Sequence, residues 1–214
     1  MRIQLELPEL TEFPNGFPRH WMNVIFTENR PDTYQIHAIT TTYVRLVEAA
    51  FAEYRQGRSL VHATWNRSDP STIPLGAHNL ACASFESCLT NMHRAVRCML
   101  KIRGRPDVPQ ALKDLIPTKP RFVEDRIADR IRDIRDAIQH LEGQVLNGTI
   151  PEKTPFMLGA VGPVTPIPEE PGQTLKTIDR LQIGNFEITF LELCTWLKEM
   201  GRCAEQISRF ERSP

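Results

Sequence analysis

Hydrophobic side chains recur at steps of three or four residues in four stretches of the chain, a spacing typical of amphipathic helices. These stretches coincide with the windows that contain no proline, residues 32–69, 75–105, 121–150 and 172–213. Because proline breaks helix interiors, long helices are confined to such windows. The periodic apolar positions are, in chain order, Ile36, Ile39, Tyr43, Val47, Ala50 and Tyr54; Ala81, Phe85, Leu89, Met92, Val96 and Met99; Val123, Ile127, Ile131, Ile134, Ile138 and Leu141; and Leu193, Leu197, Met200, Ala204 and Ile207. The pattern predicts a mainly α fold, in which a four-helix bundle buries the four apolar stripes.

The first 35 residues are expected to form an N-terminal extension of this bundle. Residues 2–7 are predicted to form a strand. The stretch that follows is rich in proline and in aromatic side chains, which are expected to pack onto the bundle: Phe13, Phe17, Trp21 and Phe26.

Two further segments are predicted to lack long helices. Residues 58–76 are predicted to be a loop with a short strand at residues 60–65. Residues 148–185 are rich in proline and glycine, and we expect an irregular insertion there, before the last helix. The dipeptide Gly184-Asn185 predicts a small hairpin within residues 175–186.

The composition is that of one folded domain spanning residues 1–214, with 41% hydrophobic and 24% charged residues. The 26 basic and 26 acidic side chains cancel, which argues against a protein that coats nucleic acid without specificity. The N-terminus does not resemble a signal peptide, and no stretch of about 18 apolar residues occurs. We therefore expect a cytoplasmic protein without a membrane segment, and the five cysteines, which form no CxxC pair, fit reduced thiols.

The third periodic stretch carries the most informative residues. Its sequence, RFVEDRIADRIRDIRDAIQHLEGQV, follows Pro120, and Gly143 is its predicted stop. Arginines alternate with acidic residues along it, which is typical of a solvated helix face with many ion pairs. Within this run, Arg135 is followed directly by Asp136 and, five positions on, by His140.

This motif resembles that of the HEPN family, helical-bundle domains whose ribonuclease members carry Arg-x4-6-His, often with a polar residue directly after the arginine. Two other arginine–histidine pairs in the chain have a similar spacing, but a proline or a glycine interrupts each. The resemblance extends, less specifically, over residues 78–210. It implies an endoribonuclease that needs no metal and no cofactor.

The resemblance also implies the chemistry. The ribose 2′-hydroxyl attacks the adjacent phosphate and leaves a 2′,3′-cyclic phosphate and a 5′-hydroxyl. His140 would transfer the proton, and Arg135 would stabilise the charge on the phosphoryl oxygens. Asp136 would be a supporting residue, four positions before His140 and able to orient its imidazole, and Arg132 would hold a flanking phosphate.

Helix geometry constrains how the two catalytic candidates meet. At about 100° per residue, Arg135 and His140 lie about 140° apart around the helix and share no narrow face. They can meet across a cleft or across the two-fold axis of a homodimer, and the family resemblance implies the homodimer. It also suggests RNA as substrate, a role as a toxin or defence effector, and an antitoxin or inhibitor protein as partner.

Two alternatives stay open at this point. The chain can be a catalytically inactive HEPN-like module that dimerises or binds RNA, a nucleotide or a protein. It can also be an unrelated helical scaffold, in which Arg135 is an ion-pair residue and His140 is stabilised by the end of the helix dipole. The other histidines and the cysteines show no metal-ligand spacing.

Overall fold

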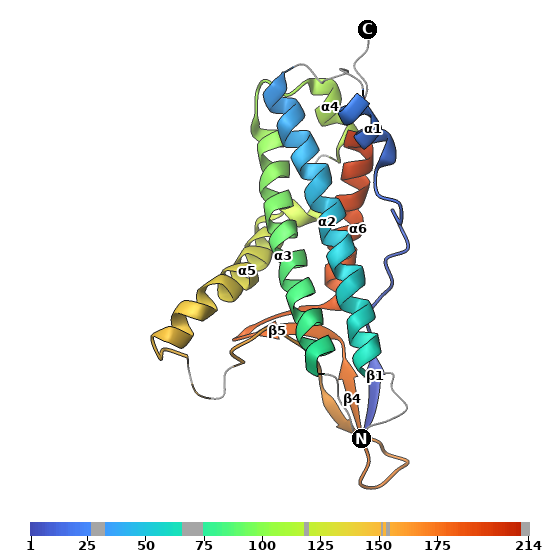
Figure 1. Ribbon diagram of the computed structural model, residues 1–214, viewed down its shortest axis with the longest axis vertical. Coiled ribbons are helices and arrows are strands. Elements are labelled where there is room, and N and C mark those ends of the chain that lie inside the picture. Colours follow the sequence, from blue (N-terminus) through green and yellow to red (C-terminus); the bar gives the residue numbers. More distant parts are fainter. Residues whose placement is uncertain (27–32, 66–74, 118–119, 151, 153–154, 211–214) are drawn as a thin grey trace. The chain divides into compact units, whose positions relative to one another are not determined.

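The computed structural model describes residues 1–26, 33–65, 75–117, 120–150, 152 and 155–210 (Figure 1). The described chain is predominantly helical with a small amount of sheet, which confirms the predicted mainly α fold. The helices are α1 (Pro18–Phe26), α2 (Tyr34–Trp65), α3 (Leu75–Gly104), α4 (Gln110–Leu115), η1 (Arg121–Val123), α5 (Asp125–Leu146) and α6 (Phe190–Ser208). The strands are β1 (Arg2–Leu5), β2 (Gly159–Val161), β3 (Val164–Pro166), β4 (Thr174–Ile178), β5 (Arg180–Ile183) and β6 (Phe186–Thr189). No described helix has the length and apolar character needed to cross a membrane.

The chain divides into two compact units, and α2, α3, α5 and α6 contribute residues to both. We call them the sheet unit and the helical unit. The sheet unit comprises Met1–Glu9, Glu53–Ser87 and Asp133–Cys194, and the helical unit comprises Leu10–Ala52, Cys88–Arg132 and Thr195–Pro214.

In the helical unit, α2 packs against α6 around a fully buried tyrosine. Tyr43 donates a hydrogen bond of 3.1 Å from its hydroxyl to the Met200 carbonyl. Directly after Met200, Gly201 leaves room for two aromatic rings, Phe13 and Phe51, which meet edge to face. A side chain at position 201 would come within 2.7 Å of Phe13, so the close approach depends on glycine.

The first residues of α5 and the preceding η1 are fixed to α6 by polar contacts. Glu199 accepts hydrogen bonds from the backbone N–H groups of Arg121 and Phe122. The Arg130 guanidinium lies 5.9 Å from the centre of the Trp196 ring, within range of a cation–π interaction. The motif helix therefore begins from an anchored position.

The sheet unit contains two three-stranded sheets, with strand orders β1-β4-β3 and β2-β5-β6. β1 pairs with β4 in parallel, with Arg2 opposite Leu175, and the other pairings are antiparallel. The predicted N-terminal strand is thus present at Arg2–Leu5, and the predicted hairpin turns at Gly184 and Asn185 between β5 and β6. Gly184 has a positive φ of 54°, which such a two-residue turn requires.

Aromatic contacts join the helices of the sheet unit to one another, and hydrogen bonds join α2 to the segment that follows β1. The Phe85 ring contacts the rings of Tyr54 and Phe190, at centroid distances of 6.0 and 5.2 Å. Tyr54 donates a hydrogen bond to the Pro8 carbonyl, and Arg58 donates one to the Leu7 carbonyl, at 2.7 and 2.9 Å. These bonds satisfy backbone carbonyls just beyond β1.

Two helix boundaries differ from those predicted. Residues 58–65 are the end of α2 and contain no strand, while residues 66–74 lie outside the described chain. Helix α5 continues past Gly143 to Leu146, and Gly148, with a φ of 62°, provides the left-handed residue after its end.

The N-terminal extension and the 148–185 insertion are more ordered than predicted. The extension contains α1, and the insertion contains β2, β3, β4 and β5. The expected aromatic packing holds for Phe13, Phe17 and Trp21, since Phe17 is buried and Trp21 donates a 2.7 Å hydrogen bond to Glu48. It is wrong for Phe26, which is 71% exposed at the end of α1.

Candidate functional site

The residues of the predicted motif lie on α5, whose apolar face holds the helix in place. Ile131 and Ile134 are buried, whereas Arg135 and Asp136 are half-buried and His140 is exposed. The alternation of apolar and charged positions thus directs the motif side chains away from the core contact of the helix.

Arg135 and Asp136 form an ion pair. Nη1 of Arg135 donates a 2.7 Å hydrogen bond to Oδ1 of Asp136, and the Arg135 side chain is only 28% exposed. Its Nε is buried and has no hydrogen-bond partner in the described chain.

His140 lies on the exposed side of α5. Within the described residues, no hydrogen bond or ion pair holds its imidazole. A pocket of about 170 Å³ lies between α5 and the β5–β6 hairpin, lined by Ala137 and Gln144 of α5 and by Asn185 and Phe186 of the hairpin. His140 itself is not among the residues that line this pocket.

Arg132, the predicted phosphate-binding residue, is half-exposed and engaged in a local ion pair. Its Nη1 lies 2.8 Å from Oδ1 of Asp129, three positions earlier on α5. Exposed pairs of this kind contribute little to stability, about 0–1 kcal/mol, and leave the guanidinium able to exchange partners.

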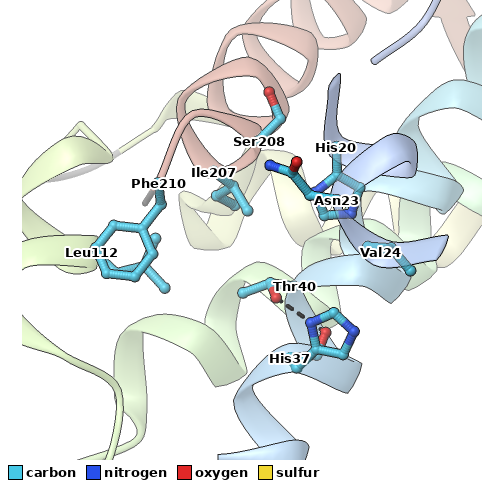
Figure 2. A pocket seen from close by; sticks show the side chains of 9 residues that line it. All are labelled: His20, Asn23, Val24, His37, Thr40, Leu112, Ile207, Ser208 and Phe210. Carbon is cyan, nitrogen blue, oxygen red and sulfur yellow. Dashed lines mark hydrogen bonds between the residues drawn. The ribbon is translucent and has the colours of Figure 1, made fainter. Parts of the chain in front are cut away.

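A pocket lined by two histidines lies in the helical unit (Figure 2). Its lining includes His20 and Asn23 of α1, His37 and Thr40 of α2, and Ser208 of α6. Burial, with a smaller contribution from the nearby His37, lowers the pKa of His20 to about 4. The pocket measures about 40 Å³, room for one or two water molecules, so it is too small for a nucleotide.

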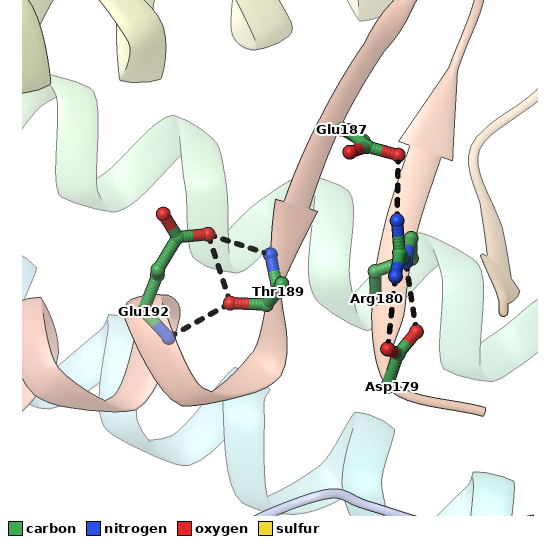
Figure 3. Close-up of polar contacts among 5 residues, drawn as sticks. All are labelled: Asp179, Arg180, Glu187, Thr189 and Glu192. Carbon is green, nitrogen blue, oxygen red and sulfur yellow. Dashed lines mark hydrogen bonds and ion pairs between the residues drawn. The ribbon is translucent and has the colours of Figure 1, made fainter. Parts of the chain in front are cut away.

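A third polar cluster, in the sheet unit, has a structural role (Figure 3). Arg180 donates two hydrogen bonds to the carboxylate of Asp179, at 2.8 and 3.0 Å, and one of 3.0 Å across the hairpin to Glu187. These hydrogen bonds occupy Nε and both terminal nitrogens of the guanidinium, and such a bidentate pair raises the pKa of Arg180. Among the described residues, no three His, Cys, Asp or Glu side chains are grouped so that they could hold a metal ion.

A row of basic residues on α3 was not identified from the sequence. Arg94, Arg97 and Lys101 line a groove of about 640 Å³ with residues of α2. Their spacing of three and four positions is a signal visible in the sequence, because it places them on one helix face. The row is inconspicuous in the sequence, since uncharged residues separate its members.

Comparisons with known proteins identify no relative of the chain. No protein-family model, no curated protein and no solved structure matches it.

Proposed function

We propose that the chain is a metal-independent endoribonuclease of the HEPN type, with Arg135 and His140 as catalytic residues and RNA as substrate. One observation carries the proposal: a half-buried arginine held by its neighbouring carboxylate precedes an exposed imidazole by five positions on the same helix. The proposed chemistry needs these two groups, one to stabilise phosphoryl charge and one to move a proton.

Arg135 suits the role of charge stabiliser. Asp136 takes one of its five N–H donors and orients the planar guanidinium. The remaining donors on the terminal nitrogens can bind two phosphoryl oxygens in the bidentate arrangement that arginine favours. Asp136 is then a positioning residue, and Arg132 would exchange its partner Asp129 for a flanking phosphate.

His140 suits the role of proton carrier. A neutral imidazole takes the proton of the ribose 2′-hydroxyl as the bond from O2′ to phosphorus forms. The bond from phosphorus to O5′ breaks, and O5′ takes a proton from an imidazolium. Because the nucleophile belongs to the substrate, DNA is not cut.

A homodimer through α5 would bring the two groups together. Since Arg135 and His140 lie about 140° apart around one helix, a two-fold arrangement lets the arginine of one copy face the histidine of the other. In such a dimer, the two His140 imidazoles serve as base and acid. Exposed apolar side chains at the end of α5, Val145 at 52% and Leu146 at 77%, supply surface for a partner helix.

The biological setting follows from the chemistry. An enzyme that cuts cellular RNA harms its own cell unless it is restrained. We therefore infer a role as a toxin or defence effector, held in check by an antitoxin or inhibitor protein.

The test is cleavage of a defined RNA in EDTA by the purified wild-type protein and its variants. Arg135→Ala and His140→Ala should each lower the rate at least about 100-fold. Arg126→Ala and Gln139→Ala, exposed positions on the same helix, are matched controls and should cut like wild type. Products should carry cyclic phosphate ends, and a 2′-deoxy substitution at the cleaved position should block the reaction.

The same assay separates the second candidate function. A wild-type protein that is folded, binds RNA and leaves it intact would be a catalytically inactive binding module. Equal cleavage by wild type and both motif variants would reject the proposed catalytic residues.

A further inference from the structure

The groove between α2 and α3 in the helical unit combines apolar and basic surfaces. It measures about 640 Å³, and its α2 side is formed by Ile39, Thr42 and Leu46. Its α3 side carries three cations, Arg94, Arg97 and Lys101. No acidic side chain of the described chain lines it.

The three cations are available for a ligand. They are exposed, and none of them forms an ion pair or a side-chain hydrogen bond with another described residue. In a chain whose 26 basic and 26 acidic residues cancel, such a row is a local concentration of positive charge. At about 1.5 Å per residue, they follow one another along α3 at steps of about 4.5 and 6 Å.

The Cys98 thiol lies in the positive field of the arginines that line the groove. This partly exposed thiol lines the groove between Arg97 and Lys101 in sequence. Burial raises the pKa of Cys98, and the positive charges of Arg94, Arg97 and Arg45 oppose this rise. The field in the groove therefore favours anions.

We propose that this groove binds single-stranded RNA, with successive phosphates on Arg94, Arg97 and Lys101 and a base against the partly exposed side chains of Ile39 and Leu100. Proteins that bind single strands combine a positively charged groove, which follows the phosphates, with side chains on which the bases pack, usually aromatic ones; here aliphatic side chains take that place. The choice of RNA rests on the proposed function, and the groove then holds the substrate through residues other than the catalytic pair.

Binding is measured with an RNA oligonucleotide carrying 2′-O-methyl groups, which cannot be cleaved by the proposed reaction. The triple variant Arg94→Gln, Arg97→Gln, Lys101→Gln should bind at least about 10-fold more weakly at low salt, and the slope of log K against log salt should fall by about 2. The control Arg2→Gln, Arg202→Gln, Arg209→Gln removes the same charge from side chains that are 64%, 64% and 68% exposed. It should bind like wild type, and equal affinity of the groove variant and this control would overturn the proposal.

His140→Ala keeps this test independent of catalysis. It should bind the oligonucleotide like wild type. Loss of binding in the groove variant together with unimpaired cleavage by His140→Ala would reject His140 as a catalytic residue and support the groove as the RNA-binding site. Unchanged binding in the groove variant together with loss of cleavage by His140→Ala would reject the RNA-binding groove and support His140 as a catalytic residue.

A local measurement shows whether the strand lies in the groove. Cys98 is partly exposed, whereas the other four cysteines are buried, so iodoacetamide should alkylate Cys98 first in the folded protein. The oligonucleotide should slow this alkylation at least several-fold, as measured by peptide mass spectrometry. Inorganic phosphate at the same phosphate concentration should not slow the alkylation. Equal protection of Cys98 by polyglutamate would show that the groove binds anions in general, and it would overturn the RNA assignment.

Discussion

Gly57 lies directly against the ring of Phe85, and this contact sets the distance between α2 and α3 in the sheet unit. A Cβ atom at position 57 would come within 2.8 Å of Cζ and 2.9 Å of Cε1 of Phe85. The ring cannot move aside easily, since Tyr54 and Phe190 lie against it. Glycine in the middle of a long helix is therefore a packing requirement here.

Gly57→Ala should lower the free energy of unfolding by about 1–3 kcal/mol, because the added methyl group overpacks this contact. Gly143→Ala is the matched control, since Gly143 lies within α5 and a Cβ there would meet no atom within 4 Å. It should stabilise the protein by about 0.5–1 kcal/mol through helix propensity. Urea unfolding of both variants measures the difference, and destabilisation of equal size in both would refute the packing argument.

The motif histidine should be dispensable for folding. His140 is exposed on α5, so His140→Ala should change the free energy of unfolding by no more than about 0.5 kcal/mol. Ile134 is buried six positions earlier on the same helix. Ile134→Ala should lower the free energy of unfolding by about 2–5 kcal/mol. Thermal unfolding of the two variants provides the comparison. A melting temperature of His140→Ala as low as that of Ile134→Ala would mean that His140 is a structural residue.

Helical periodicity predicted the long helices and most of their buried positions. It located four long helices, and most positions of the predicted apolar stripes are buried, including Tyr43, Met92 and Leu197. The exceptions, which are partly exposed, are Ile39, Ile127, Ile138 and Leu141. Helix periodicity succeeds because a helix buries one face wherever it packs.

Other features depend on partners distant in sequence. The Arg2–Leu175 pairing of β1 with β4 joins opposite ends of the chain, and no local pattern specifies it. The need for glycine at position 57 is not visible in the sequence, because the Phe85 ring comes from another helix. At the candidate site, the sequence indicated that Arg135 has acidic neighbours, but only the structure identifies Asp136 as its hydrogen-bond acceptor.

The start of α6 provides a prediction about helix capping. Thr189 and Glu192 form a reciprocal pair: the Thr189 hydroxyl oxygen accepts from the Glu192 backbone N–H, and the Glu192 carboxylate accepts from the Thr189 backbone N–H (Figure 3). This is the capping box, which satisfies two backbone donors of the first turn. Thr189→Ala should lower the free energy of unfolding by about 0.5–2 kcal/mol, while Thr189→Ser should retain most of the stability. Urea unfolding tests this, and equal losses in both variants would exclude a contribution from the hydroxyl.

The buried His20 should make the protein less stable in mild acid. Its pKa is about 4 in the folded protein, chiefly because of burial, whereas an unfolded histidine titrates near 6.5. Between these values the unfolded chain binds a proton that the folded protein does not, so stability is full above pH 6.5 and falls as the pH drops toward 4. The shift corresponds to a loss of about 3 kcal/mol. Burial also lowers the pKa values of His62 and His78, which add to the decline in the same direction.

His20→Gln removes this titration and should therefore flatten the pH dependence. Urea unfolding between pH 8 and pH 4 should show a smaller loss of stability for His20→Gln than for wild type, whatever the two stabilities are at pH 8. Gln139→Ala changes an exposed residue that does not titrate and should leave the wild-type slope unchanged. If His20→Gln retains the full slope, His20 is protonated in the folded protein as readily as in the unfolded chain, and its burial in the small pocket has no effect on its charge.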